Sequence, residues 1–512
     1  MNSIIVKKLG WENSAELQGT FENIEKDFSK NKKQVIVLSA LKADGNVIND
    51  KFNVSDMLIE AWDCLGTKKK KKYTQAFWII NEVQNFHIEM IEEKLWKKST
   101  KATQYIKQVF ENVKQEMIYY VKNDKKVFIP WKGNDYSIST KSNTPLSLLW
   151  LWENIAAHVL QNTITSYNIE WLKSEVIDTS HLLLGEKLGN ISESEIFDIL
   201  TTKLAQRVHF ILEQWKIPII PGFINHYPEG ILNKVWRGYS DATNSIVWVW
   251  LHNLWKSVKI EIQKYVDGFK SSDPRIVKSG TKLISKLDYT TGIESISSNG
   301  ADAKLLHEQS LRGKVQLAWL PIKIYNPFNN SKWTIINKAG DKNAKWVQAV
   351  LWRKEAFTVS VNSPVMWIWF SEKVSSITAD LWIDMYEQSG SVTDMTFWIG
   401  KDDKNKLGIL EDKIRDELDL YSKEGGRFVN SYKDRSVVFC IWQNINWEPG
   451  ASARATMTLA MNDIDIKSTS HWETQRALSF TIDSKDYDKA INVLHEEFIV
   501  KSKLKHLIPL QK

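Results

Sequence analysis

The chain has little cysteine and no long hydrophobic run. Only two of its 512 residues are cysteine, Cys64 and Cys440, which is too few for a disulfide framework or a four-cysteine zinc site. A reducing compartment, the cytoplasm, is therefore expected. No apolar stretch reaches the roughly 18 residues that a membrane-spanning helix needs. The residues from Met1 to Lys8 lack the layout of a signal peptide, so we expect no membrane association.

The chain also lacks a strong charge of either sign. A net charge of +7 over 512 residues gives no strong case for a nucleic-acid partner. The one dense basic run, Lys68 to Lys72, is typical of a solvated loop, with a polyanion contact as the alternative reading. No cluster of metal ligands stands out. The absence of a G-x-x-x-x-G-K-[ST] motif argues against an ordinary P-loop kinase.

Strands and helices alternate along the first 340 residues. Ile4–Val6, Val35–Ala40 and Ile217–Ile220 have the composition of buried strands, whereas residues 55–125 and Leu146–Leu160 have helical periodicity. This alternation predicts βαβ units and an α/β fold with a mainly parallel sheet. The polar stretch Lys338–Asn343 closes this region.

The remaining sequence has a different order of elements, which occurs twice. Strand, helix, two strands and a further helix are predicted over 345–430 and again over 431–512, an internal repeat. The predicted strands are Ala356–Val361, Ile383–Glu387, Val392–Ile399, Ser436–Ile441, Ile464–Ser468 and Arg476–Ile482, and the predicted helices are Ser371–Leu381, Lys406–Tyr421, Ala451–Met461 and Tyr487–Phe498.

Two motifs in the α/β region carry polar groups suited to anions. The first is K-V-W-R-G-Y-S-D-A-T-N-S from Lys234, and the second is Y-V-D-G-F-K-S-S-D-P-R from Tyr265. A loop that precedes a helix offers unpaired N–H groups to an anion. Arg237 adds a guanidinium fork that fits a carboxylate, and Arg275 adds a second cation. The spacing alone indicates an anion-binding α/β protein.

These motifs resemble the nucleotide and amino-acid site of aspartate kinases in the amino acid kinase family, which read roughly G-R-G-G-S-D-x-T-A and V-D-G-x-x-T-A-D-P-R. Lys8, in K-K-L-G-W, resembles the lysine of the family's K-F-G-G-T-S. The repeat resembles paired ACT domains. The resemblance implies a three-layer α/β/α amino acid kinase domain over 1–340, followed by two ferredoxin-like (βαββαβ) ACT domains over 345–430 and 431–512.

The resemblance also implies an activity. ATP, with Mg²⁺, would phosphorylate the side-chain carboxylate of L-aspartate, the first step of lysine, threonine and methionine biosynthesis, with lysine or threonine as a feedback effector. A homodimer or higher homo-oligomer through the ACT domains is implied as well. The alternative is a catalytically weak or inactive ACT-based amino-acid sensor, because Glu12, Asn13 and the pair Lys264-Tyr265 depart from the family pattern. Composition alone suggests a third reading, a carbohydrate binder with tryptophan platforms.

Site residues follow from the matched motifs. The implied catalytic residues are Lys8, Arg237 and Asp241; the substrate-binding residues are Ser39, Ser55, Glu153, Arg237 and Ser240; the nucleotide-binding residues are Lys8, Lys264, Asp267, Asp273, Arg275 and Lys304; and the effector-binding residues are Met366, Trp367, Ser371 and Asp384. Plainer readings stand beside three of them. Asp241 is also a plausible helix cap, Asp273-Pro274-Arg275 is also a common turn, and Glu153 also suits a helix N-terminus, where Gly185-Glu186 competes for its role.

Glycine is scarce and tryptophan abundant. The chain has 22 Gly and 24 Trp, whereas an average glycine content of about 7% would give roughly 36. Several tryptophans occupy positions where the family has glycine, at turns or close approaches that favour a residue without a Cβ. We hypothesise that many are UGA codons of a source that reads UGA as glycine. The positions concerned are Trp11, Trp152, Trp236, Trp333, Trp352, Trp367, Trp369, Trp442 and Trp472.

Overall fold

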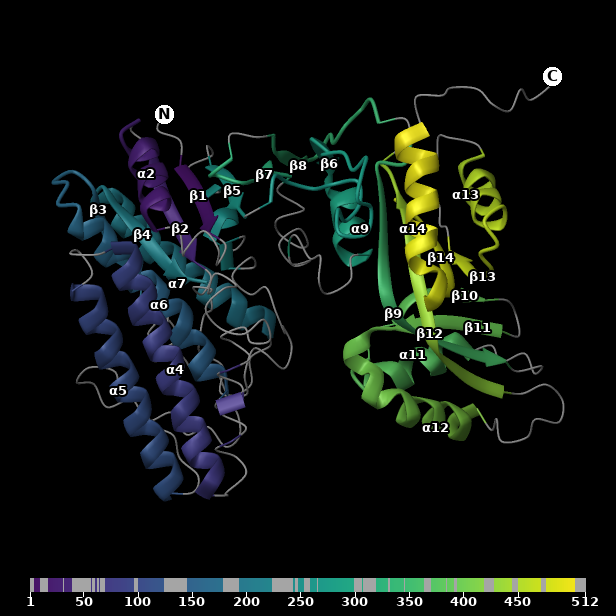
Figure 1. The fold of residues 1–512 in the computed structure, drawn as a ribbon, viewed down its shortest axis with the longest axis horizontal. Helices are drawn as coiled ribbons and strands as arrows, with labels where there is room; N and C mark the ends of the chain where they lie inside the picture. The colour runs from purple at the N-terminus through teal and green to yellow at the C-terminus, as the bar shows by residue number, and fades with distance from the viewer. Residues whose placement is uncertain are drawn as a thin grey trace. The chain divides into compact units, whose positions relative to one another are not determined.

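The structure is a computed structural model, drawn in Figure 1. It describes residues 4–9, 17–30, 32–38, 57, 60–61, 64, 70–95, 100–123, 145–177, 193–222, 243–244, 247–252, 258–264, 266–298, 306, 319–329, 332–344, 346–362, 370–383, 385–390, 394–418, 428–443, 450–470 and 476–501. The chain divides into two compact units, 1–268 with 309–335 and 269–308 with 336–512.

The first unit is built on a parallel sheet. Its strands lie in the order β3 (Lys173–Val176), β4 (Lys216–Pro221), β2 (Lys33–Leu38), β1 (Ile4–Leu9), β5 (Val258–Gln263) and β7 (Ile322–Tyr325). Every neighbouring pair in that order is parallel. β1 and β2 are buried along their whole length, as expected for parallel strands that are covered on both faces. The predicted α/β fold with a mainly parallel sheet is confirmed.

Helices cover this sheet. One hydrophobic core joins α2 and α6 to the sheet through Phe21, Ile24, Leu160 and Ile36, and Phe21 stacks on Tyr167 with ring centroids 3.7 Å apart. α7 packs on β4 and β2, and α4 packs on α5. The helices of this unit are α2 (Leu17–Phe28), α4 (Lys70–Leu95), α5 (Thr100–Asn123), α6 (Pro145–Ser166) and α7 (Glu193–Glu213).

The second unit contains a six-stranded antiparallel sheet. Its order is β10 (Met385–Gly390), β11 (Asp394–Ile399), β9 (Ala349–Asn362), β12 (Phe428–Ile441), β14 (Ala477–Asp483) and β13 (Ile466–Ser470). The helices are α11 (Phe370–Asp380), α12 (Leu407–Leu418), α13 (Ala451–Ala460) and α14 (Tyr487–His495), and the unit also holds β6 (Lys286–Asp288) and α9 (Tyr289–Ser298); the boundary between the units falls within β8 (Thr334–Asn337). The ferredoxin-like arrangement predicted for the repeat is confirmed.

Two hydrophobic cores share the long central strands β9 and β12. Phe357 and Val359 of β9 pack with α11 and α12 in one core. Val350 and Trp352, nearer the start of the same strand, pack with α13 and α14 in the other. The two halves of the repeat are therefore interleaved through one sheet. The domain boundaries expected at 345 and 431 stay a prediction.

No described helix combines the length and the apolar character needed to cross a bilayer.

Left-handed backbone at tryptophan bears on the glycine hypothesis. Within the described residues, the non-glycine residues with positive φ are Asn168, Trp215, Trp319, Trp382 and Asp463. Asn and Asp tolerate this region, whereas a bulky aromatic residue there is a genuine outlier. All three tryptophans are at least 37% exposed, so full burial of an aromatic side chain does not account for them. Three of five such positions being tryptophan supports the reading of these residues as misassigned glycines.

Trp382 occupies the position that ends a helix in a Schellman motif. Its N–H donates to the Ala379 carbonyl at 2.9 Å, and the N–H of Ile383 donates to the Thr378 carbonyl at 2.9 Å. This pair of bonds places Trp382 at the C′ position of α11, where glycine is the usual residue. Trp215 is placed in the same way after α7, with its N–H donating to the Leu212 carbonyl at 3.1 Å.

The nine tryptophan positions named from the sequence fall into three groups: two lie in the core, two lie elsewhere in the described chain, and five lie outside the described residues. Trp352 and Trp442 lie in the buried core and outside the left-handed region. The prediction of a strained backbone is therefore wrong for these two. The indole N–H of Trp442 has no hydrogen-bond partner in the described part of the chain, an unsatisfied donor that disfavours burial. Trp333 is exposed and Trp152 lies within α6. Trp11, Trp236, Trp367, Trp369 and Trp472 lie outside the described residues.

Trp382→Gly should raise the free energy of unfolding by about 1 kcal/mol, because an L-residue in the left-handed region costs roughly 1–2 kcal/mol. Trp382→Ala is the matched control: it removes the indole but keeps the Cβ, so it should bring little or none of the gain. Urea denaturation of the three proteins measures this. Equal gains from Gly and Ala would mean that the indole, not φ, is unfavourable. UGA codons in the gene at Trp215, Trp319 and Trp382 would agree with the hypothesis, and UGG codons would end it.

Candidate functional site

The carboxyl ends of the parallel strands form the candidate site. Leu9 of β1 lies level with Leu38 of β2 and with Gln263 of β5, and Leu38 is level with Pro221 of β4. Ligands of open parallel sheets bind outside this edge. Lys8, only 4% exposed, is the penultimate residue of the central strand β1. Lys8 therefore lies within the first strand, next to the edge where ligands of open parallel sheets bind, and its role in phosphoryl transfer stays a prediction.

The first motif reaches the same edge through Thr243. Its hydroxyl donates to the Gly222 carbonyl at 2.6 Å, in a buried position. The N–H of Gly222 in turn donates to the Leu38 carbonyl at 2.8 Å, at the end of β2. Arg237, Ser240 and Asp241 of this motif lie outside the described residues, and Thr243 is three positions after Ser240 in the chain.

Two predicted nucleotide-binding residues follow β5 at this edge. The backbone N–H of Lys264 donates to the Tyr325 carbonyl at 3.0 Å, at the end of β7. The carboxylate of Asp267 is half-buried and accepts a hydrogen bond from Asn329 Nδ2 at 2.9 Å. Lys8, Lys264 and Asp267 thus share one unit and one edge of its sheet.

Glu153 lies inside α6, more than two turns from its start at Pro145, and is half-buried. The alternative that this glutamate is favoured by the helix N-terminus is wrong, because the effect of the helix dipole falls off within the first turn. A role in holding substrate stays a prediction.

Asp273 and Arg275 form a closed turn in the second unit. The Asp273 carboxylate accepts the backbone N–H of Arg275 at 2.8 Å and two guanidinium nitrogens at 2.6 and 2.9 Å. Burial by itself raises the pKa of Asp273, but the hydrogen bonds and charge of Arg275 outweigh it and lower the pKa. The carboxylate therefore stays ionised and orients a guanidinium whose side chain is 64% exposed. The plain reading of Asp273-Pro274-Arg275 as a turn is confirmed, and the nucleotide-binding role of Arg275 stays a prediction.

The remaining predicted residues are only partly described. Ser371 is exposed in the first turn of α11. Ser39, Ser55, Gly185, Glu186, Lys304, Met366, Trp367 and Asp384 lie outside the described residues.

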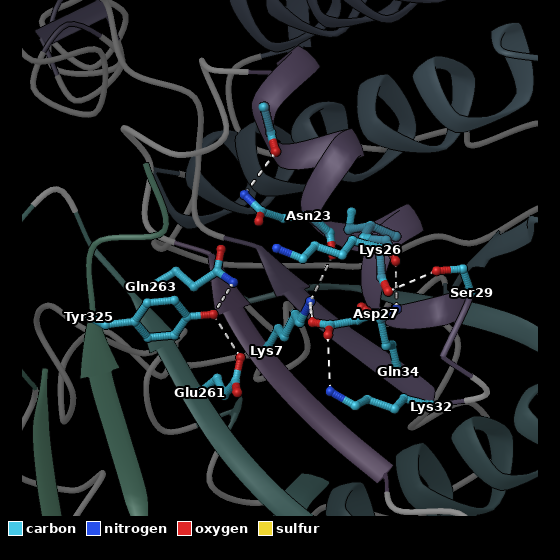
Figure 2. A network of polar contacts seen from close by, with 12 residues as sticks. Lys7, Asn23, Lys26, Asp27, Ser29, Lys32, Gln34, Glu261, Gln263 and Tyr325 are labelled. Atoms are coloured by element: carbon cyan, nitrogen blue, oxygen red, sulfur yellow. Dashed lines mark hydrogen bonds and ion pairs between the residues drawn. The ribbon is translucent and has the colours of Figure 1, made fainter. Parts of the chain in front are cut away.

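A buried ion pair involves the residue before Lys8 and was not predicted from the sequence. Lys7 Nζ lies 2.6 Å from Asp27 Oδ2, with the Lys7 side chain only 1% exposed. Figure 2 shows Lys7 of β1 pointing to α2, where Asp27 also contacts Lys32 at 3.2 Å. Burial alone raises the pKa of Asp27, but Lys7 and Lys32 outweigh it and lower the pKa. The signal was available: a second lysine in an otherwise apolar strand requires an acidic partner.

A second polar group lies beside this pair. Glu261 of β5 is level with Lys7 of β1, and Tyr325 donates its phenolic proton to Glu261 Oε2 at 2.7 Å while accepting from Gln263 Nε2 at 2.8 Å. Burial first, and then the charge of Glu261, raise the pKa of Tyr325 above its ordinary value, so Tyr325 remains a donor. The Lys7–Asp27 pair and the Tyr325–Glu261–Gln263 group are neighbours on one face of the sheet, because Lys7 and Glu261 are level on adjacent strands. Lys8, the next residue of β1, has its side chain on the other face.

Comparison with known proteins agrees with this architecture. Residues 9–312 match the amino acid kinase family and residues 443–498 match the ACT domain. The aspartokinase of Schizosaccharomyces pombe is 25% identical over 376 residues, which span 66% of this chain and 66% of that protein, slightly under two thirds of its length. Among solved structures, E. coli aspartokinase III in complex with aspartate and ADP has a TM-score of 0.69 at 15% identity and covers 96% and 99% of the two chains. Clostridium acetobutylicum aspartate kinase has a TM-score of 0.64 at 17% identity, over 97% and 99%.

The fold and the edge site define an α/β protein that carries a C-terminal ACT fold. Because the family match covers more than half of the 512 residues, the chain belongs to the amino acid kinase family. The structural likenesses, at these identities, show the fold.

Asp27→Asn should lower the free energy of unfolding at pH 7 by about 3 kcal/mol, because it leaves the buried charge of Lys7 without an anionic partner. The folded pKa of Asp27 is lowered, so its stabilisation is present above the unfolded pKa of about 3.9 and is lost as pH falls through the folded value. The variant should therefore lose less stability than the unmodified protein on acidification below about pH 4.

Glu175→Gln is the matched control. Its partners Arg207 and Lys216 are 49% and 32% exposed, so they return to water and the loss should stay under about 1 kcal/mol. Urea denaturation at pH 7 and pH 3 compares the two variants. Similar losses in the free energy of unfolding from both variants would contradict the claim that the Lys7–Asp27 pair stabilises the fold because Lys7 is buried.

Proposed function

We propose that the protein is an aspartate kinase that transfers the ATP γ-phosphate to the side-chain carboxylate of L-aspartate. The observation that carries the proposal is Lys8, nearly buried at the carboxyl end of the central parallel strand, with Lys264 and Asp267 at the same edge. Phosphoryl transfer needs positioned cations and little covalent chemistry from the protein. The names of the curated relatives support the choice of aspartate.

The proposed site residues suit distinct parts of this reaction. The Lys8 ammonium would offset charge on the transferred phosphoryl group. Asp273 holds the guanidinium of Arg275 in an outward, ionised position suited to nucleotide phosphates. Glu153 would bind the amino group of the substrate, and Arg237 its carboxylate with a fork that suits two oxygens. Alignment of the attacking carboxylate by these two ends supplies much of the rate.

Magnesium would accompany ATP. It keeps several water ligands and takes one or two carboxylates, and the half-buried carboxylate of Asp267 is a donor of that type. When bound, the ion neutralises phosphate charge.

We further propose that lysine or threonine binds the ACT region, and that ACT domains mediate a homodimer or a higher homo-oligomer. With only two cysteines in 512 residues, the chain has too few for a disulfide framework, which fits a cytoplasmic location. The second candidate function is an ACT-based sensor with weak or no kinase activity. The observation that favours it is the Lys264-Tyr265 pair, which departs from the family motif.

Arg237→Ala should lower kcat/KM for aspartate about 100-fold, because loss of a desolvated carboxylate clamp costs about 3 kcal/mol or more. Arg237→Lys should not restore activity, since the fork geometry is lost. Aspartate-dependent ADP release measures both. Arg207→Ala, which removes an exposed arginine from α7, should leave activity near that of the unmodified protein. Activity of Arg237→Ala near that level would refute the substrate-site assignment, and no aspartate-dependent ADP release from the unmodified protein would favour the sensor.

Ser371→Ala should weaken binding of lysine or threonine about fivefold or more, because an exposed hydroxyl in the first turn of α11 lies where a carboxylate meets unpaired N–H groups. Ser376→Ala, a change of the same size at an exposed position of the same helix, is the control. Calorimetry on the full-length chain measures both. Equal affinities in the two variants would place the effector elsewhere.

A further inference from the structure

The second nucleotide motif belongs to the same compact unit as the ACT sheet. Residues 269–284, here called the 269–284 hairpin, carry Asp273 and Arg275 at their turn and lie in the unit of 336–512. The hairpin is closed by two backbone hydrogen bonds of 2.8 Å, from Ser271 N to Lys282 O and from Ile284 N to Phe269 O. It is joined to the ACT sheet by a third, from Val350 N of β9 to Ser271 O at 2.8 Å.

Apolar packing attaches the turn of the hairpin to an ACT core. Val277, two residues after Arg275, is 4% exposed and belongs to the core that contains Leu494, Phe498 and Ile499, and Ile276 packs against the same core. The backbone of Val277 also donates to the Asp273 carbonyl at 2.9 Å. Displacement of this core would therefore move the turn that orients Arg275.

Polar contacts attach the hairpin to the C-terminal helix. The Ser271 hydroxyl lies 3.0 Å from His495 Nε2, with both residues 1% exposed. The same hydroxyl accepts the N–H of Lys282 at 2.9 Å, and Lys282 Nζ donates to the carbonyl of Ile499, in the π-helical turn Glu496–Val500 after α14. Burial first, and then the charge of Lys282, lower the pKa of His495 to about 4, so at neutral pH the ring is uncharged and can accept from Ser271.

At Gly280 the hairpin packs closely against Val500. This glycine has φ of +83°, and an added Cβ would lie 3.1 Å from Val500 Cγ2. Backbone, apolar and side-chain contacts thus hold the hairpin to the last helix of the chain.

We propose that Ser271 and His495 are positioning residues for the nucleotide: by holding the 269–284 hairpin to α14, they set where Asp273 and Arg275 meet the ATP phosphates. This inference rests on the proposed function.

The test measures the affinity for nucleotide separately from the affinity for aspartate, on the full-length chain. Ser271→Ala and His495→Leu should each raise KM for ATP and the Kd for Mg²⁺–ADP about tenfold, within the usual range of coupling between sites, while KM for aspartate changes less than about twofold. His495→Gln, which keeps an acceptor for the Ser271 hydroxyl, should retain most of the affinity. The Ser271→Ala/His495→Leu double variant should lose little more than either single variant, since both remove one contact.

Ser436→Ala is the matched control. Its hydroxyl is equally buried, donates to the Lys354 carbonyl at 2.5 Å and lies 2.9 Å from Ser484 Oγ. These contacts are within the same unit but outside the hairpin, so the variant reports a general loss of stability. Its KM for ATP should stay near that of the unmodified protein.

The outcomes distinguish the positioning role of Ser271 and His495 from the proposed kinase activity. Unchanged ADP affinity in Ser271→Ala and in His495→Leu, or an equal loss in Ser436→Ala, would overturn the positioning role. Absence of aspartate-dependent ADP release from the unmodified protein would refute the proposed function, whereas the calorimetric ADP affinities would still report on the hairpin. If His495→Leu does not fold, Ser271→Ala against His495→Gln decides the matter.

Discussion

The buried cation of Lys7 constrains the whole first unit. A charge removed from water in the central strand must have a fixed partner, and Asp27 supplies it from α2 at 2.6 Å. The pair therefore fixes the helix against the strand, in addition to the apolar contacts of Phe21 and Ile24. Once β1 is held in this register, alternation along the strand sends Lys8 to the opposite face. The position of Lys8 in the candidate site therefore follows from the pairing of Lys7 with Asp27.

The second unit depends on a different constraint, the length of its central strands. β9 and β12 each span fourteen residues, so each contributes one end to the core with α11 and α12 and the other to the core with α13 and α14. Each long strand therefore contributes to both cores, although the pairing of β9 with β12 shifts register between Tyr432 and Val437. The 269–284 hairpin joins this system at β9 through Val350.

Local composition and periodicity predicted many of the elements, because both reflect local burial. The strands Ile4–Val6 and Ile217–Ile220 are continuous apolar runs, typical of buried parallel strands. The helices of the repeat follow a period of 3.6, and neither pattern requires knowledge of distant residues. The partners of Lys7 and the packing of Val277 could not be predicted in this way, since each depends on a contact between segments far apart in the chain. The sequence motif V-D-G-F-K-S-S-D-P-R reads as one site element, yet Asp267 falls in the first compact unit and Asp273 in the second.

The same limit explains the tryptophan result. Family-like motifs directed attention to glycines near ligands, and two of the named positions, Trp352 and Trp442, instead fill a core. The clearest demand for glycine arises away from any motif, at Trp215 and Trp382, where a helix ends. A C′ position requires φ > 0 because of backbone hydrogen bonding, whatever the protein binds. Backbone geometry thus tests the assignment of glycine independently of function, and at Trp382 it does so where the side chain is 75% exposed.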